Sequence, residues 1–148
     1  MTKSDFIANF DVEQTPQEVF AAIGNVPGWW SGAVEGVPDR VGAEFTYRVP
    51  GVHFCRMRVT DFVPGERMVW RVVESDIEYV GRKTEWNDTE IRFEMAAEGG
   101  MTELRFTHQG LVPALECFDA CSNAWNALVT KNLQNLIRTG EVQPSPWA

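Results

Sequence analysis

One long amphipathic segment near the C-terminus limits most strongly how this chain can fold. From Pro113 to about Thr139 no strong helix breaker occurs, and Gly140 stands where a C-cap belongs. Apolar residues recur there at steps of three and four, which predicts one helix of about 25 residues, or about 37 Å. This apolar stripe consists of Leu115, Phe118, Cys121, Trp125, Leu128, Val129, Leu133 and Leu136.

Six earlier segments alternate between apolar and polar residues, which is the pattern of half-buried β-strands. A sheet with one apolar face must be covered on that face, and the C-terminal helix has the length to do so. We therefore predict an α+β fold, with a curved six-stranded antiparallel sheet wrapped around a long C-terminal helix. The predicted strands are Phe6–Val12, Glu44–Val49, Cys55–Thr60, Arg67–Glu74, Thr89–Met95 and Thr102–His108.

Two short helices are expected after the first strand. The run Thr15-Pro16-Gln17-Glu18 is a capping box with proline at the first helical position, and Gly24 ends the helix that follows. Residues 26–32 form a turn or a second short helix that carries the adjacent pair Trp29 and Trp30. The stretch from Ser75 to Lys83 fits neither periodicity.

The length and net charge of the chain limit the number of domains and the kinds of partner that it can have. A chain of 148 residues corresponds to a single domain, with a core over about residues 5–140 and a tail over 141–148. The net charge of −8 argues against duplex nucleic acid or an anionic membrane as the partner, because both require a positive face. The sequence contains no run of 18 apolar residues, which a membrane-spanning helix would need, and the N-terminus lacks the pattern of a secretion signal. We expect a cytoplasmic protein.

The cysteines and short motifs indicate no cofactor and no metal. Cys55, Cys117 and Cys121 are an odd number in a compartment expected to be reducing, so they are predicted to be free thiols. Cys117 and Cys121 could share a helical face, but neither His53 nor His108 completes a zinc-type spacing with them. No phosphate-binding glycine loop, dinucleotide fingerprint or nucleophile elbow occurs, so no motif marks an enzyme.

Several motifs, in their order and spacing, resemble a known superfamily. They are Thr15–Ile23 followed by Trp29-Trp30, then Gly42–Phe45 and Val63–Trp70, and finally Glu85–Glu94 followed by Leu104–Leu111. Together they resemble the SRPBCC (START-like) superfamily, in its branch of homologues of the heat-shock-protein ATPase activator. The resemblance implies a helix-grip fold with a cavity between sheet and helix. It also implies functions from binding lipids, hormones or polyketides to cyclisation, and it makes a homodimer an expectation.

Large aromatic residues and a few polar ones are the candidates for the wall of such a cavity. Indole rings supply apolar contact area, and their N–H groups can hold a ligand oxygen. The predicted ligand-binding residues are Trp30, Tyr47, Cys55, Met57, Trp70, Trp86, Phe93, Phe106, His108, Phe118, Cys121 and Trp125. His108 is the best polar candidate, whereas His53 is expected near a rim. The alternative interpretation is that each of these residues is ordinary core.

Three functions remain open at this point. The first is a binding protein that holds a small apolar or aromatic molecule without turnover. The second is an enzyme of the cyclase, aromatase or hydrolase type that uses His108 as general acid or base. The third is a protein-interaction module, associated with stress or chaperones, that acts through an exposed patch including Trp29 or the tail residue Trp147.

Overall fold

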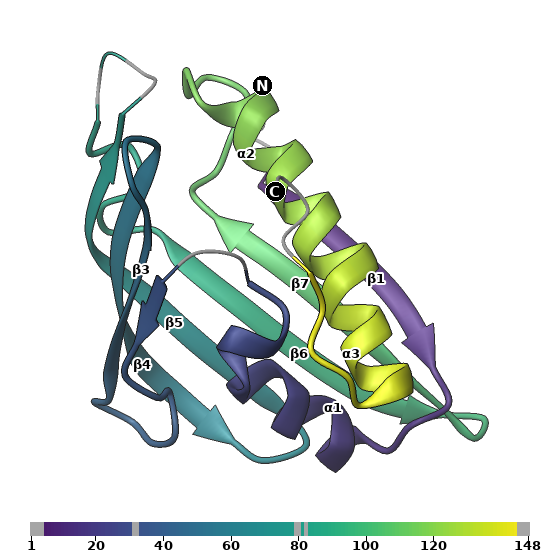
Figure 1. The fold of residues 1–148 in the computed structure, drawn as a ribbon. Coiled ribbons are helices and arrows are strands. Elements are labelled where there is room, and N and C mark those ends of the chain that lie inside the picture. The colour runs from purple at the N-terminus through teal and green to yellow at the C-terminus, as the bar shows by residue number, and fades with distance from the viewer. Residues whose placement is uncertain (1–4, 31–32, 79–80, 82, 145–148) are drawn as a thin grey trace.

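The computed structural model describes residues 5–30, 33–78, 81 and 83–144. Within these ranges seven strands form one antiparallel sheet in the order β1-β7-β6-β5-β4-β3-β2 (Figure 1). The strands are β1 (Phe6–Val12), β2 (Ala33–Glu35), β3 (Glu44–Val49), β4 (His53–Val63), β5 (Arg67–Ile77), β6 (Glu90–Glu98) and β7 (Met101–Gln109). The first strand pairs with β7, the last strand before the C-terminal helix, and β1 and β2 lie at the two edges of the sheet.

The helices form two groups on the concave side of the sheet. The helix α1 (Pro16–Gly24) and the 3-10 helix η1 (Val26–Gly28) follow β1. The C-terminal helix consists of α2 (Phe118–Trp125), the π-helical segment η2 (Asn126–Leu133) and α3 (Gln134–Thr139), which follow one another without a break. It ends at Gly140, whose φ of 74° is the left-handed conformation that glycine adopts readily.

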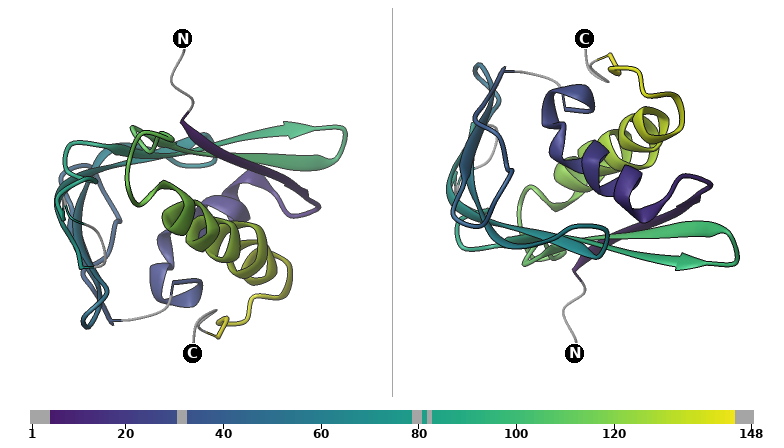
Figure 2. Two further views of the ribbon diagram at one scale, coloured as in Figure 1. Left: turned by 90° about the horizontal axis from the view of Figure 1, so that it is seen from above. Right: turned by 90° about the horizontal axis from the view of Figure 1, so that it is seen from below.

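The sheet bends around the C-terminal helix, as Figure 2 shows in two views. Strands β3 and β4 stand on one side of the helix, and β6, β7 and β1 lie on another. The pairing of β4 with β5 shifts register between Arg56 and Met57 and again between Val59 and Asp61. Such bulges bend and twist a strand, so they account for the curvature in this part of the sheet. The predicted helix-grip architecture is confirmed.

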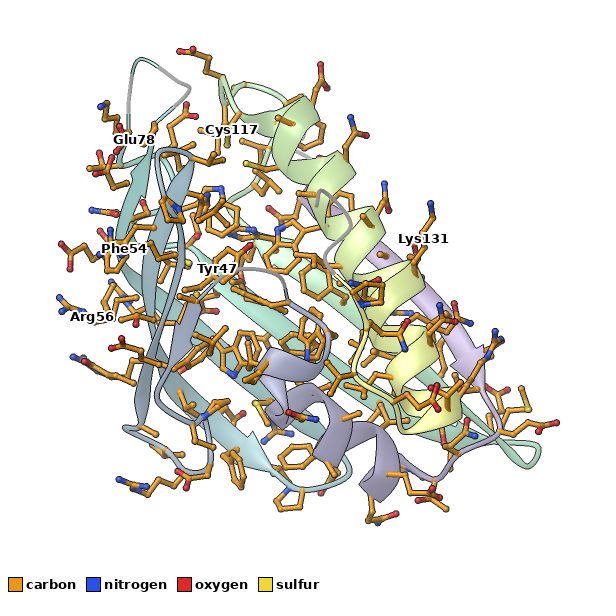
Figure 3. The ribbon with its side chains drawn as sticks, in the orientation of Figure 1. Tyr47, Phe54, Arg56, Glu78, Cys117 and Lys131 are labelled. Carbon is orange, nitrogen blue, oxygen red and sulfur yellow. The ribbon has the colours of Figure 1, made fainter. Side chains whose placement is uncertain are left out.

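The two faces of the sheet differ as the alternation predicts. On β4, Cys55, Met57 and Val59 are fully buried, whereas the intervening arginines are exposed. Arg58 binds Glu44 on β3 at 2.9 Å, and Arg56 binds Glu74 on β5 at 2.8 Å. Figure 3 shows Arg56 pointing away from the sheet while Tyr47 points into the concave side. Exposed pairs of this kind add little stability, so the inner face supplies most of it.

Three features differ from the sequence prediction. The sheet has a seventh strand among the described residues, because the short segment β2 adds to the edge of β3. The uncertain stretch after Ser75 begins as part of β5, which continues to Ile77. The C-terminal helix starts at Phe118 instead of Pro113, because the residues between them form turns.

The exposed patch expected at Trp29 is wrong. Trp29 is fully buried, and its indole Nε1 donates a hydrogen bond to the backbone oxygen of Ile23 at 3.2 Å. The segment carrying it is tied to the C-terminal region, because the amide of Asn132 donates to the Trp29 oxygen at 3.2 Å. Trp147, the other residue predicted for that patch, lies outside the described residues.

None of the helices in the described ranges combines the length and the apolar character needed to cross a bilayer.

Candidate ligand cavity

A cavity of about 490 Å³ lies between the β3–β4 side of the sheet and the start of the C-terminal helix. The sheet side contributes residues of β3, of the following turn and of the beginning of β4, and the loop before β6 adds Trp86. The helix side contributes residues of α2 and the first turn of η2. The lining residues are Trp30, Tyr47, Val49, Val52, His53, Trp86, Ala120, Cys121, Ala124, Trp125 and Leu128.

Small side chains on the helix explain why space remains here. Ala120 and Ala124 stand four residues apart, so they occupy the same face of α2 and both line the cavity. Further along the helix, beyond the cavity, larger apolar side chains are buried, as Val129, Leu133 and Leu136 show. The apolar stripe is therefore thin at its N-terminal end, and a gap opens where two methyl groups face a bent sheet.

Five aromatic side chains in the cavity wall contact one another in a closed circuit. We call this circuit the aromatic belt, and every member of it lines the cavity. The ring centroids lie 4.6 Å apart for Trp30–Tyr47, 6.0 Å for Tyr47–His53 and 4.6 Å for His53–Trp86. The circuit closes through Trp86–Trp125 at 5.7 Å and Trp125–Trp30 at 5.5 Å. Mutual packing fixes each ring, so the belt presents a rigid apolar wall.

Three nitrogen atoms of the belt are buried and lack a hydrogen-bond partner among the described residues. They are the indole Nε1 atoms of Trp30 and Trp86 and the imidazole Nε2 of His53. Burial lowers the pKa of His53 to about 4, so the imidazole is neutral at physiological pH. The described residues that line the cavity include no lysine, arginine, aspartate or glutamate. The wall is therefore apolar and uncharged, with isolated hydrogen-bonding positions.

His108 does not line the cavity, because its hydrogen bonds hold it in the core. The indole Nε1 of Trp125 donates to its Nδ1 at 3.0 Å, and its Nε2 lies 2.8 Å from the hydroxyl oxygen of Thr89. The Thr89 hydroxyl donates to the backbone oxygen of Trp86 at 2.6 Å, so the Nε2–H of His108 must donate to Thr89. Burial, with a smaller contribution from nearby His53, lowers the pKa of His108 to about 3. His108 is a neutral, fully buried residue with both ring nitrogens engaged.

The three thiols are buried, and those of Cys55 and Cys117 are held in the protonated form. Burial is the main reason that the pKa of Cys55 is raised, and hydrogen bonding to Cys121 is the main reason for Cys117. In the described structure none of the three forms a disulfide. Because a thiolate is the reactive form, Cys55 and Cys117 have the properties of core residues and not of nucleophiles.

Glu85 has a local structural role at the beginning of the C-terminal helix. Its carboxylate accepts hydrogen bonds from the backbone N–H of Glu116 at 2.9 Å and from that of Cys117 at 3.1 Å. These are N–H groups that precede the helix, and the helix has no capping side chain of its own there. Glu85 therefore fixes the start of α2, and with it the helix side of the cavity.

The structure brings five of the twelve predicted ligand-binding residues together in the described cavity wall. They are Trp30, Tyr47, Trp86, Cys121 and Trp125. Six others are fully buried in the packed core and do not reach the cavity, namely Cys55, Met57, Trp70, Phe93, Phe106 and His108. Phe118 is half-buried at the first turn of α2 and packs against the core. Contact of any of them with a ligand stays a prediction.

Six lining residues were not in the predicted set, namely Val49, Val52, His53, Ala120, Ala124 and Leu128. Strand alternation could have found Val49, because it shares a face with Tyr47. Helical spacing could have found the two alanines, since Ala124 lies three residues after Cys121 and Ala120 lies four residues before Ala124. The sequence prediction considered mainly large side chains and therefore missed the alanines, although small side chains are what leave room for a cavity.

The sequence was also compared with models of known protein families. The profile of the family described as Activator of Hsp90 ATPase homolog 1-like protein matches residues 13–138. The chain belongs to this family. The matched range runs from just before α1 to the last turn of α3, so it includes every element that lines the cavity. The resemblance noted from the sequence motifs is confirmed.

Solved structures share the fold at low sequence identity. The Aha1 dimer from Colwellia psychrerythraea has a TM-score of 0.74 and 20% identity, over 93% of this chain and 98% of the other. DynU16, a putative protein in the dynemicin biosynthetic locus, has a TM-score of 0.69 and 17% identity. That match covers 93% of this chain but 48% of DynU16, so this chain spans about half its length.

CalU16 from Micromonospora echinospora has a TM-score of 0.64 and 19% identity, over 98% of this chain and 79% of the other. A search of curated proteins gave no match. At these identities the solved structures show a common fold.

Proposed function

We propose that this protein binds a small apolar or aromatic molecule in the cavity between sheet and C-terminal helix, without chemical turnover. The observation that carries the proposal is the aromatic belt in the wall of a cavity of about 490 Å³. This volume lies within the range of small-molecule sites, which are mostly apolar with a few placed polar groups. A core that served stability alone would gain from filling such a space.

The alternative of an enzyme that uses His108 loses its support. A general acid or base must reach the proton that it transfers, whereas both nitrogens of His108 are engaged inside the core. The interaction module loses one of the two residues that motivated it, because Trp29 is buried, whereas Trp147 lies outside the described residues. A homodimer in the cytoplasm stays part of the proposal, and the related fold solved as a dimer from Colwellia psychrerythraea supports the dimer.

Ligand binding can be tested without knowing the natural ligand. The purified protein is extracted with organic solvent for mass spectrometry, and a panel of neutral apolar and aromatic compounds is screened by thermal shift. A compound present at 100 times its Kd should stabilise the folded state by about 2.7 kcal/mol, which is a clear rise in Tm. Because three tryptophans line the cavity, their fluorescence should change with the same Kd. If nothing is extracted and no compound raises Tm, the proposal fails.

A further inference from the structure

We propose that Trp30 and His53 are polar anchors that select an uncharged aromatic ligand carrying a ring-borne carbonyl or hydroxyl oxygen. This inference rests on the proposed function and narrows its ligand class. Both residues belong to the aromatic belt, and both pack against Tyr47, with ring centroids 4.6 Å and 6.0 Å away. The third unpartnered nitrogen of the belt, Nε1 of Trp86, lies beside the Cys117 thiol, so Trp30 and His53 are the two anchors proposed.

Trp30 supplies a hydrogen-bond donor. Its side chain is 5% exposed, and its Nε1–H has no acceptor within the described ranges of the chain. An indole N–H can donate but not accept, so a ligand must bring an acceptor oxygen to it. Trp29, the neighbouring tryptophan, shows the contrasting state, because its Nε1–H already has the oxygen of Ile23. Leaving a buried donor unpaired costs free energy, which a ligand oxygen would recover.

His53 supplies a second position that suits an oxygen atom. Its Nε2 is buried without a partner in the described structure, and it lies at the start of β4 where the cavity wall meets the turn. A neutral imidazole nitrogen either donates to a carbonyl or accepts from a hydroxyl. His53 differs in this respect from His108, whose two nitrogens are both engaged.

The charge of the surroundings excludes an anionic ligand. Placing a carboxylate in an apolar cavity requires a paired cation, and the described lining residues offer no lysine or arginine. The net charge of −8 over the whole chain adds repulsion of anions. A flat neutral ring with one oxygen substituent fits both conditions.

Three naphthalene probes of similar shape test the selection. They are 2-acetylnaphthalene, with a carbonyl, 2-isopropylnaphthalene, without an oxygen, and 2-naphthoate, which is negatively charged at pH 7. Equilibrium dialysis with chromatographic detection of the free probe gives each Kd independently of tryptophan fluorescence. We expect 2-acetylnaphthalene to bind about tenfold more tightly than 2-isopropylnaphthalene, and 2-naphthoate to bind more weakly than either.

Matched variants assign the preference to the two nitrogens. Trp30→Phe removes the indole N–H, and His53→Phe removes the imidazole nitrogen at the edge of the cavity. Each should reduce the preference for the acetyl probe several-fold while 2-isopropylnaphthalene still binds. Trp70→Phe is the control, because Trp70 Nε1 is also buried without a partner in the described residues but does not line the cavity. Circular dichroism establishes that each variant is folded.

The outcomes separate this inference from the proposed function. Equal binding of the acetyl and isopropyl probes would overturn the anchors while leaving a binding cavity. A preference that survives both Trp30→Phe and His53→Phe would also overturn them. If no probe binds the wild-type protein, the inference fails together with the proposed binding of aromatic ligands. Loss of the preference in the Trp30 or His53 variant, with retention in Trp70→Phe, is the expected result.

Discussion

The two histidines show how much a single residue depends on its neighbours. Both lie on strands at positions that the alternation assigns to the inner face. His108 finds Trp125 on the helix and Thr89 before β6, and these close a hydrogen-bond chain around it. His53 finds aromatic rings and a cavity. The sequence predicts that both side chains lie on the inner face of the sheet. The hydrogen-bond partners of His108 come from residues 17 and 19 positions away in the chain, whereas His53 faces the cavity.

The neutral state of His108 predicts a loss of stability in acid. Its pKa is lowered to about 3 in the folded protein, against about 6.5 in an unfolded chain, so the unfolded chain binds a proton that the folded one excludes. Stability is complete above pH 6.5 and falls as the pH drops toward 3, by about 2 kcal/mol at pH 5 for this residue. The variant His108→Gln should be less stable at pH 7 by about 1–3 kcal/mol, because hydrogen bonds are lost.

Urea unfolding at pH 7 and pH 5 checks this prediction. Between these two pH values, wild-type protein should lose about 2 kcal/mol more than His108→Gln does. Carboxylates and His53 titrate in both proteins, so the difference isolates His108. Parallel pH dependences would show that His108 is not held neutral.

Some strands and helices could be predicted from the local sequence pattern, and others could not. Alternation placed the six longer strands and their faces, because a side-chain period of two is a property of the strand itself. The strand β2 covers three residues, Ala33–Glu35, and owes its existence to pairing with β3, so no local pattern indicates it. The π-helical segment Asn126–Leu133 likewise has no breaker or cap at its ends. Elements that depend on a distant partner are the ones that local reasoning missed.

The capping box of α1 is an element that the sequence specified correctly. The Thr15 hydroxyl accepts from the backbone N–H of Glu18 at 3.2 Å, and the Glu18 carboxylate accepts from the Thr15 N–H at 3.2 Å. Thr15→Ala should lower the free energy of unfolding by about 1 kcal/mol, because the helix loses its capping acceptor. Gln17→Ala, an exposed position in the same turn, should change it by less than about 0.5 kcal/mol. Equal effects in chemical denaturation would contradict the cap.

At the scale of the whole molecule, the cavity exists because the side chains of the sheet and of the C-terminal helix do not fill the space between these two layers. The bent sheet presents aromatic rings, and the first turns of the helix present Ala120 and Ala124. Further along, η2 packs against β1, and α3 packs against β1 and α1, with larger apolar side chains. The space therefore lies at one end of the interface, beside the belt.

Filling this space should separate stability from binding. Ala124→Phe places a ring in the cavity, so Tm should rise, consistent with a gain of about 0.5–2 kcal/mol from cavity filling. The Kd for 2-acetylnaphthalene should increase at least about tenfold, because probe and ring compete for the same volume. Asn123→Leu, exposed on the same helix, is the control and should leave probe affinity unchanged. Unchanged affinity in Ala124→Phe would place the ligand elsewhere.

The sequence by itself determined the layout: alternating strands with one apolar face, a capped short helix, and a helix with a long apolar stripe. These features follow from local periodicity, which each segment carries in its own residues. The tertiary structure decided which aromatic rings became core and which became wall, since Trp70 and Trp86 have the same side chain but different neighbours. Which rings line the cavity depends on the bend of the sheet and on the two alanines that face it. The space between sheet and helix is set by the combined volumes of side chains that lie far apart in the sequence, so no local pattern predicts it.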